Sequence, residues 1–144
     1  MRSTSLAVTP PTAALATSVV GVGVDAVDVD RFRKILARRP GFAARFFTLS
    51  ELADADRTGD PAESLAARFA AKEAVMKALG TGLGGFALTD VEVRRSDGSG
   101  ATRGAPLLSL HGAAATLAHH HGATRFHLSL THTSHVAVAF VVVE

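Results

Sequence analysis

The chain has 144 residues, a length that fits one domain, and 47% of its residues are hydrophobic while 19% are charged. This mixture is typical of a globular domain and excludes a collagen-like repeat or a disordered polar chain. Because the chain contains no cysteine, disulfides, thiolate metal ligands and a cysteine nucleophile are excluded, and a reducing compartment is compatible with the composition. The formal net charge of +2 does not by itself identify a partner.

Residues 1–18 are rich in Ser, Thr, Ala and Pro, and we interpret them as a flexible leader or a cloning-derived extension before a single domain, residues 19–144. A signal peptide is the alternative, since Arg2 precedes an apolar stretch, but Pro10 and Pro11 interrupt that stretch. No run of residues approaches the ~18 apolar residues of a membrane span. We therefore expect no membrane partner.

A strand and a helix are predicted next. Residues 19–24 contain only Val and Gly, which predicts a buried strand that ends at Asp25. Residues 28–39 favour a helix, because apolar residues recur there at helical spacing and Pro40-Gly41 follows.

Basic residues gather in and after this helix. Between residues 31 and 50 there are six basic residues and no acidic one; they are Arg31, Arg33, Lys34, Arg38, Arg39 and Arg45. Such a patch indicates a negatively charged partner, which could be nucleic acid, a membrane or an acidic protein. A solvated helix face is the alternative interpretation of the same pattern.

The clearest helix begins after Asp60. Asp60 is a candidate N-cap, Pro61 suits the first helical position, and Glu63 is expected to complete a capping box. We expect this helix to end at Gly80. The glycine-rich loop after it can approach a ligand closely because it carries few side chains.

The C-terminal half is predicted to be mostly strand. Its expected strands are residues 90–95, 106–111, 125–130 and 135–143, with a helix at residues 112–121. The last two strands are close enough in sequence to form a hairpin around a turn at residues 131–134. Since strands and helices do not alternate regularly, the sequence favours an α+β fold.

Two charged residues on the long helix are candidates for chemistry. Glu73 and Lys77 are four residues apart and therefore share one helix face. An ordinary i,i+4 ion pair is one explanation. The alanine-rich sequence around them favours another, because it lets other backbone approach closely. A carboxylate and an ammonium beside a glycine-rich loop are suited to hold Mg²⁺ and a phosphate.

Histidines are concentrated near the C-terminus, and His132 is expected at the end of the predicted hairpin. His127 is expected within a strand as a structural residue. A zinc site formed by His127, His132 and His135 is conceivable, but the spacing matches no compact zinc pattern. The chain also lacks a His-Glu-x-x-His helix motif.

Three motifs then occur in order: Gly21-Val-Gly-Val-Asp25, Arg68-Phe-Ala-Ala-Lys-Glu-Ala-Val-Met-Lys-Ala-Leu-Gly-Thr-Gly82, and His127-Leu-Ser-Leu-Thr-His-Thr133. Together they make residues 19–144 resemble the holo-acyl-carrier-protein synthase family of 4′-phosphopantetheinyl transferases. The resemblance implies an α+β fold in which a mostly antiparallel sheet packs with a long central helix and a basic N-terminal helix. It also implies transfer of 4′-phosphopantetheine from coenzyme A to a serine of apo-acyl carrier protein, with release of adenosine 3′,5′-bisphosphate.

The resemblance also implies roles for individual residues. Asp25 and Glu73 correspond to Mg²⁺ ligands, and Lys77 corresponds to a contact of the pyrophosphate. The remaining coenzyme-binding positions are Arg68, near the phosphates, and Gly80, Thr81, Gly82 and His132, near the nucleotide or coenzyme. Glu73, Lys77 and His132 are the implied catalytic residues.

Elementary chemistry agrees with these roles. Breaking the phosphoanhydride increases negative charge on the leaving phosphate, which Mg²⁺ and Lys77 would stabilise. The serine hydroxyl needs a base, for which Glu73 and a metal-bound water are both candidates.

The resemblance implies a specific partner for the basic helix. In the family this helix docks an acidic helix of the carrier protein, and the matching positions here are Arg31, Ile35, Arg38, Phe42 and Arg45, with Phe46 as a further apolar contact. The sequence departs from the family at Gly41, where a basic residue is common. It departs again at Gly104-Ala105-Pro106, which replaces the usual Gly-Lys-Pro.

The resemblance further implies a homotrimer with its site between subunits, and a cytoplasmic location. The runner-up hypothesis is a nucleic-acid-binding module that uses the basic residues 31–45. It predicts salt-sensitive binding that is indifferent to Mg²⁺ and coenzyme A. Because the chain has no Tyr or Trp for base stacking, we expect no nucleic-acid partner.

Overall fold

A computed structural model describes residues 18–82, 84–98 and 103–144. Of the expected leader, residues 1–17 lie outside the described residues. Within the described part of the chain, no helix is long and apolar enough to cross a membrane.

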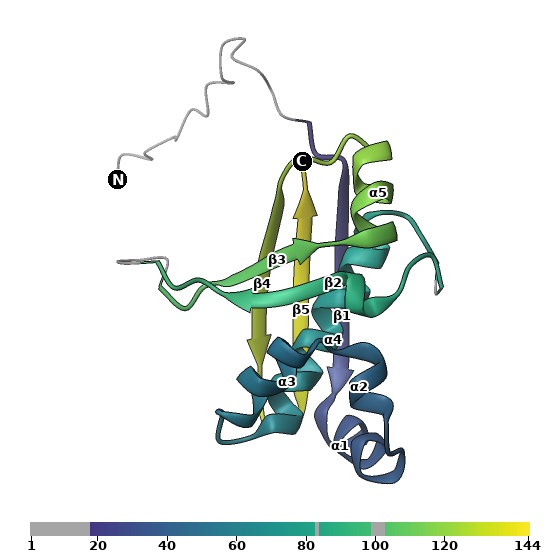
Figure 1. The fold of residues 1–144 in the computed structure, drawn as a ribbon. Helices are drawn as coiled ribbons and strands as arrows, with labels where there is room; N and C mark the ends of the chain where they lie inside the picture. The colour runs from purple at the N-terminus through teal and green to yellow at the C-terminus, as the bar shows by residue number, and fades with distance from the viewer. Residues whose placement is uncertain (1–17, 83, 99–102) are drawn as a thin grey trace, which may run out of the picture.

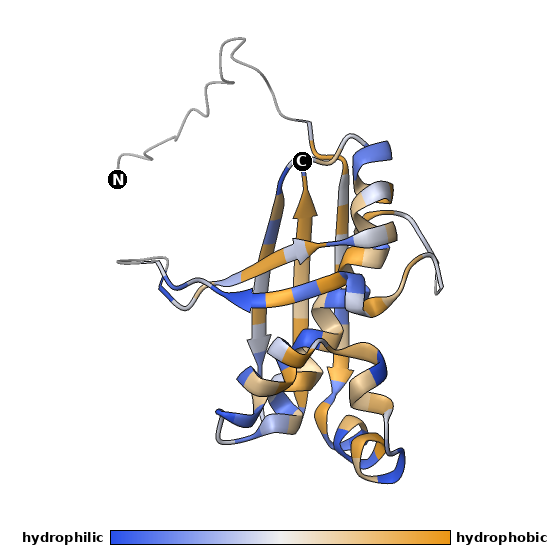
Figure 2. Cartoon of the chain, in the orientation of Figure 1, coloured by the Kyte–Doolittle hydropathy of each residue, from blue (hydrophilic) through white to orange (hydrophobic). Residues whose placement is uncertain are grey.

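The larger sheet has three antiparallel strands in the order β1 (Gly21–Asp28), β5 (Val136–Val143) and β4 (Phe126–His132) (Figure 1). The central strand β5 is apolar along its length (Figure 2). Asp25 lies opposite Ala139 of β5, and His132 lies opposite Ala137 of the same strand. β1 and β4 are therefore the two edges of this sheet, and each edge carries one predicted site residue.

Strand β1 differs from the prediction in its end and in its burial. It continues to Asp28 instead of ending at Asp25, because all its residues pair with β5. Gly23 is buried, whereas Val22 and Val24 are each 53% exposed. Only one face of the strand is therefore covered, and period-two alternation puts Asp25 on the covered face with Gly23.

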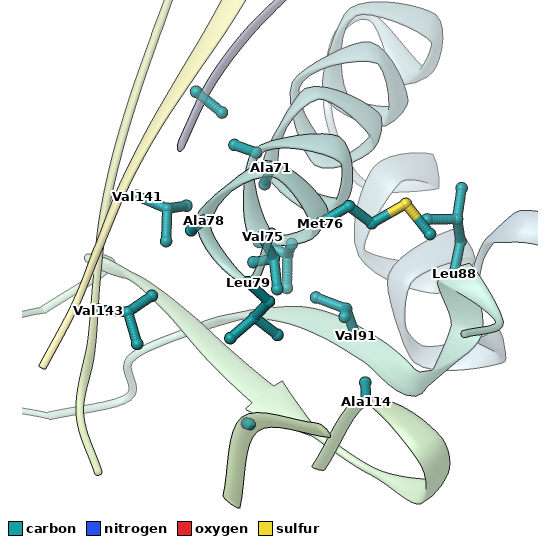
Figure 3. Packing of buried hydrophobic residues seen from close by; sticks show 14 of the residues in the cluster. Ala71, Val75, Met76, Ala78, Leu79, Leu88, Val91, Ala114, Val141 and Val143 are labelled. Atoms are coloured by element: carbon teal, nitrogen blue, oxygen red, sulfur yellow. The ribbon is translucent and has the colours of Figure 1, made fainter. Parts of the chain in front are cut away.

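The central helix α4 (Pro61–Ala78) packs against that covered face. Its length agrees with the prediction, and Asp60 is its N-cap, as expected. Figure 3 shows how residues near its C-terminal end meet β5 on one side and η1 (Leu88–Asp90) and the start of β2 on the other. Because α4 is covered on both sides, few of its side chains point toward solvent. The positions of those few are well defined.

Three short helices lie at one end of the sheet (Figure 1). The predicted basic helix is α1 (Val29–Arg38), which Asp28 caps. The helices α2 (Phe42–Phe46) and α3 (Leu49–Asp56) were not predicted. A complete capping box, in which Thr48 and Glu51 exchange side-chain and backbone hydrogen bonds, begins α3.

The remaining elements follow the predicted order. A two-stranded antiparallel sheet joins β2 (Val91–Arg95) and β3 (Pro106–Leu110), and α5 (Gly112–His120) leads from it back to β4. Strand β4 starts at Phe126 and ends at His132, so it extends two residues beyond the predicted strand. The α+β class, the mostly antiparallel strands and the three predicted helices are confirmed.

Candidate active site

The first candidate cluster forms where β1 lies against α4. A Cβ atom added to Gly23 would stand 1.9 Å from the backbone oxygen of Ala74, and one added to Gly21 would stand 1.8 Å from that of Ala78. Only glycine therefore allows the strand to approach the helix this closely. The close approach brings Asp25 beside the face of α4 that carries Glu73 and Lys77, and we call these three residues the carboxylate cluster.

Within the carboxylate cluster, Lys77 bonds across to the strand rather than along its own helix. Its Nζ atom donates to Oδ1 of Asp25 and to the carbonyl oxygen of Val24, each at 2.9 Å. The i,i+4 pair with Glu73 that spacing alone suggested is replaced by this contact. The Lys77 side chain is 53% exposed and Asp25 is 17% exposed, so the cluster faces solvent at the edge of the sheet.

Glu73 is half-buried, and burial raises the pKa of its carboxyl group; the charge of Asp25 raises this pKa further and Lys77 opposes the rise. A carboxylate whose ionisation is disfavoured beside a second carboxylate is a suitable place for a cation. Among the described residues, no group of three or more acidic, His or Cys side chains could hold a metal. Mg²⁺ needs only one or two protein carboxylates when phosphate oxygens complete its coordination, so Asp25 and Glu73 fit this ion.

The second candidate site is a cavity of about 670 Å³ on the other side of α4. The first turns of α4, the strands β2 and β4, and the segment before β3 form its walls. Polar groups from α4 and β4 line it, and they include Asp60, Glu63, Ser64, Arg68, Ser129 and His132. We call this cavity the pocket.

Arg68 is the most buried cation of the pocket, with 6% of its side chain exposed. Its guanidinium donates to the backbone and side-chain oxygens of Ser64, and lies 3.8 Å from Asp54. Among the residues that the structure describes, its Nε atom has no hydrogen-bond partner. Burial lowers the pKa of Arg68, and Asp54 opposes that change. A buried cation with an unused donor beside a cavity favours an anionic ligand there.

His132 faces the pocket from the edge strand β4. Its Nδ1 atom is 3.0 Å from Oε1 of Glu63. The capping box predicted for α4 is therefore wrong in part: Asp60 accepts a hydrogen bond from the backbone N–H of Glu63, but the Glu63 side chain turns to His132. Sequence patterns did not indicate this pair because its members lie 69 residues apart.

The three histidines weighed as a zinc site have different partners. His127 contacts Glu144, while His135 contacts Asp30 and His132 contacts Glu63. His127 is a partnered residue, but its side chain is 52% exposed rather than packed on the sheet. The described histidines therefore do not converge on a metal.

The carboxylate cluster and the pocket do not meet within one chain. Glu73 comes five positions after Arg68, which turns their side chains about 140° apart around α4. Asp25 and His132 lie on opposite edge strands with β5 between them. The predicted site residues thus form two groups rather than one.

The turn after α4 follows the carboxylate cluster. Gly80 has φ +65°, a left-handed conformation that suits glycine at a helix end. Thr81 donates a hydrogen bond from its hydroxyl to the carbonyl oxygen of Gly82. Since Lys77 lies in the last turn of the helix, Gly80, Thr81 and Gly82 are close to it along the chain.

The basic helix α1 carries a groove of its own, with a volume of about 450 Å³. We call it the docking groove, and it is lined by Arg31, Lys34, Ile35, Arg38, Arg39 and Phe42. Four of the five residues predicted for docking thus lie along it. The fifth, Arg45, instead lies over the ring of Phe46, with its guanidinium carbon 5.4 Å from the ring centre.

One departure from the family pattern, Gly41, is itself a left-handed glycine, and the other, Ala105 in place of the usual lysine, directly follows one. Gly41, which precedes α2, has φ +86°, and Gly104, which lines the pocket, has φ +77°. A lysine or arginine at Gly41 would be strained by this backbone. Lys34 and Arg39, which were not predicted as docking residues, add positive charge to the groove.

Comparisons with known proteins show the family to which this chain is similar. A model of the 4′-phosphopantetheinyl transferase superfamily matches residues 21–140. A holo-[acyl-carrier-protein] synthase from Frankia casuarinae is 50% identical over 127 residues, which cover 88% of this chain and 98% of that protein.

Two solved structures of named holo-[acyl-carrier-protein] synthases have the same fold. The Neisseria meningitidis protein matches with a TM-score of 0.74 and 33% identity, covering 88% of this chain and 99% of its own. The Bacillus anthracis protein, in complex with CoA (3′,5′-ADP), matches with a TM-score of 0.69 and 35% identity, covering 87% and 96%.

Proposed function

The chain belongs to the 4′-phosphopantetheinyl transferase superfamily, and we propose that the carboxylate cluster and the pocket together form its active site. The protein transfers the 4′-phosphopantetheine group of coenzyme A to a serine of apo-acyl carrier protein and releases adenosine 3′,5′-bisphosphate. The reaction needs groups that bind a pyrophosphate, stabilise a leaving phosphate and accept a proton. The chain offers candidates for each.

Asp25 and Glu73 are the proposed Mg²⁺ ligands. The observation that carries this proposal is the pair of carboxylates at the β1 edge, where burial and Asp25 together raise the pKa of Glu73. When bound, the ion supplies positive charge that offsets the charge growing on the leaving phosphate. Lys77 adds a fixed ammonium to the same region, and breaking its contact with Asp25 frees it for a phosphate oxygen.

The pocket is the proposed site of the coenzyme's nucleotide part. Arg68 supports this role, because its charge is buried and its Nε donor lacks a partner within the described part of the chain. His132 supports it too, since the Glu63 carboxylate lies against its Nδ1 side and leaves the Nε2 side of the ring for a ligand. The turn of Gly80, Thr81 and Gly82 is proposed to lie against the nucleotide.

A proton must leave the serine hydroxyl as it attacks the β-phosphorus atom. We propose that this proton passes to Glu73, either directly or through a water molecule that Glu73 orients. Burial and Asp25 raise the pKa of Glu73 in the metal-free chain, but a bound Mg²⁺ would hold this carboxylate ionised, which favours the route through water. The new bond joins the serine oxygen to phosphorus, and the bond to the bisphosphate leaving group breaks.

The two groups can meet only if one chain supplies the carboxylate cluster and another supplies the pocket. The outer face of β1 and β5 is available for such a contact, because Val22, Val24 and Phe140 are exposed on it. Exposed apolar patches of this kind mark association surfaces. We propose a homotrimer, in which a heterologous contact repeats until the ring closes.

Mixing two inactive variants tests the shared site. Glu73→Ala removes the carboxylate cluster of one chain, and His132→Ala removes a pocket residue. After the subunits exchange, about a quarter of the interfaces would join an intact cluster to an intact pocket, if mixing is random. Recovered activity near that fraction supports a shared site, whereas a mixture as inactive as its parts contradicts it.

The docking groove is the proposed binding surface for the carrier protein. Four cations surround the apolar side chains of Ile35 and Phe42, which suits an acidic amphipathic helix. Arg31, Ile35, Arg38 and Phe42 are its proposed contacts, and Arg45 extends the surface. Charge complementarity of this kind mainly accelerates association and selects the partner.

The activity is tested by incubating the protein with coenzyme A, Mg²⁺ and an apo-acyl carrier protein. The expected result is a mass gain of about 340 Da on the carrier, the size of the phosphopantetheine arm. Chelating the divalent cation should abolish the gain. An unchanged carrier mass with folded protein would contradict the function, and full activity in chelator would contradict the metal. We further propose a cytoplasmic location, in agreement with a chain free of cysteine.

A further inference from the structure

An ion pair connects the docking helix α1 to the first turn of α4. Arg33 donates from Nη1 to Oδ1 of Asp60 at 2.8 Å and from Nη2 to Oδ2 at 2.7 Å. This two-pronged geometry fixes orientation as well as distance. Arg33 is absent from the docking groove, which Arg31, Lys34 and Arg38 line from another side of the same helix.

Asp60 belongs to the pocket. It lines the cavity and caps α4 by accepting from the backbone N–H of Glu63, the residue whose side chain contacts His132. The pair therefore links the helix that is proposed to bind the carrier protein with a wall of the cavity that is proposed to bind the coenzyme.

The turn between β4 and β5 is tied to α1 as well. The backbone N–H of Val29 donates to the carbonyl oxygen of His135 at 2.9 Å, and the His135 ring lies 3.2 Å from Asp30. These contacts hold only the first turn of α1. Val29 and Phe32 are the buried residues of this helix, and Leu36 packs partly buried against the same apolar cluster. Arg33 adds a directional polar contact from α1 to the start of α4.

We propose that Arg33 and Asp60 are positioning residues that hold the docking helix at a fixed angle to the pocket, so that a carrier protein bound in the docking groove presents its serine to the coenzyme. This inference rests on the proposed function of the groove. It separates the arginines of α1 by role: Arg31 and Arg38 bind the carrier, whereas Arg33 orients the helix that carries them.

Steady-state kinetics with varied carrier protein and varied coenzyme A tests the pair. Because the docking groove stays intact in Arg33→Ala, we expect KM for both substrates to stay within about twofold while kcat falls about two- to fivefold, the range of an exposed ion pair. Arg33→Lys should recover only part of kcat, since an ammonium cannot form the two-pronged contact.

Asp60→Asn is the second variant, and it keeps an N-cap oxygen for α4. It should lower kcat as Arg33→Ala does, and the double variant should be no worse than either single one, because both remove the same contact. If Arg33 instead touched the carrier directly, Arg33→Ala would raise the carrier KM and Asp60→Asn would not. That pattern, additive effects or an unchanged kcat would each overturn the inference.

Two further variants serve as references. Arg125→Ala removes an exposed arginine that also contacts a carboxylate but lies at the far end of β4, and it should leave kcat unchanged; an equal fall in kcat would overturn the inference. Arg31→Ala should raise the carrier KM. If it does not, the docking groove itself is wrongly assigned, an outcome distinct from failure of the Arg33–Asp60 pair alone.

Discussion

Two lysines on the central helix form ion pairs of nearly equal length in very different surroundings. Lys72 lies 2.8 Å from Glu51 and Lys77 lies 2.9 Å from Asp25. Both members of the first pair are fully buried, whereas Lys77 is 53% exposed. The distance between charges thus does not distinguish them, but access to a ligand does.

The buried pair uses its hydrogen-bonding capacity within the protein. Lys72 donates to Glu51 and to the backbone oxygens of Leu88 and Val91, which accounts for all three of its donors. Glu51 also accepts from the backbone N–H groups of Thr48 and Val93. Burial lowers the pKa of Lys72 and Glu51 opposes that change. This pair joins α3, α4 and β2 and offers nothing to a substrate.

The largest expected effect comes from breaking the buried pair. Lys72→Met leaves the Glu51 carboxylate buried without its cation, and we expect the free energy of unfolding to fall by about 3–5 kcal/mol. Urea unfolding followed by circular dichroism measures this. The double variant Lys72→Met/Glu51→Gln should recover part of the loss, because it removes the unpaired charge. A loss below about 1 kcal/mol in the single variant would contradict the structural role of this pair.

The same substitution at the exposed pair should change the stability little and the activity strongly. Lys77→Met removes an exposed contact, so the free energy of unfolding should change by less than about 1 kcal/mol. The turnover number should fall about 10²- to 10³-fold, as is usual when one charge-stabilising group is lost from an active site. Unfolding and transfer assays on one preparation measure both. A fully active Lys77→Met would remove Lys77 from the proposed site.

The third expected effect concerns the contact that brings Asp25 to the helix. Gly23→Ala puts a methyl group against the backbone oxygen of Ala74, 1.9 Å away before relaxation. Because backbone must move, we expect a loss of about 1–3 kcal/mol in unfolding free energy and lower activity as Asp25 shifts. Gly59→Ala is the matched control for stability, since its added Cβ meets nothing within 4 Å. Equal stabilities of the two variants would contradict the tight packing of β1 on α4.

These two regions also show what sequence patterns can and cannot predict. Helical spacing predicted that Glu73 and Lys77 share one face. The motif Gly21-Val-Gly-Val-Asp25 predicted the strand that carries the second carboxylate. The pairing of Lys72 with Glu51 was not predicted, because Glu51 lies 21 residues away on a helix that was itself not expected. Its capping box, Thr48 with Glu51 three residues later, was a usable signal.

Contacts between residues that lie far apart in the sequence also explain the errors around the pocket. Glu63 has the spacing of a capping-box residue, and local patterns cannot reveal that His132 competes for its carboxylate. Strand β1 contains only Val and Gly over its first four residues, which resembles a strand buried on both faces. Its outer face is nevertheless exposed in the single chain. Patterns read along the sequence thus predicted the elements well, and missed the contacts that tertiary structure creates.

The smallest expected effect is the acid response of the Arg33–Asp60 pair, the exposed counterpart of Lys72–Glu51. The hydrogen bonds from Arg33 and from the backbone N–H of Glu63 lower the pKa of Asp60 from 3.8 to about 2. The fold therefore favours the ionised carboxylate, so this contribution to stability is present above pH 4 and disappears as pH falls from about 4 to about 2.

In Arg33→Ala the main cause of the lowered pKa of Asp60 is gone, and Tm should decrease less steeply over that range. Since solvent screens the pair, the difference from wild type should be about 2 °C or less. Thermal unfolding between pH 2 and 5 measures it, with Arg125→Ala as the control, and parallel curves for wild type and Arg33→Ala would show that Arg33 does not hold Asp60 ionised.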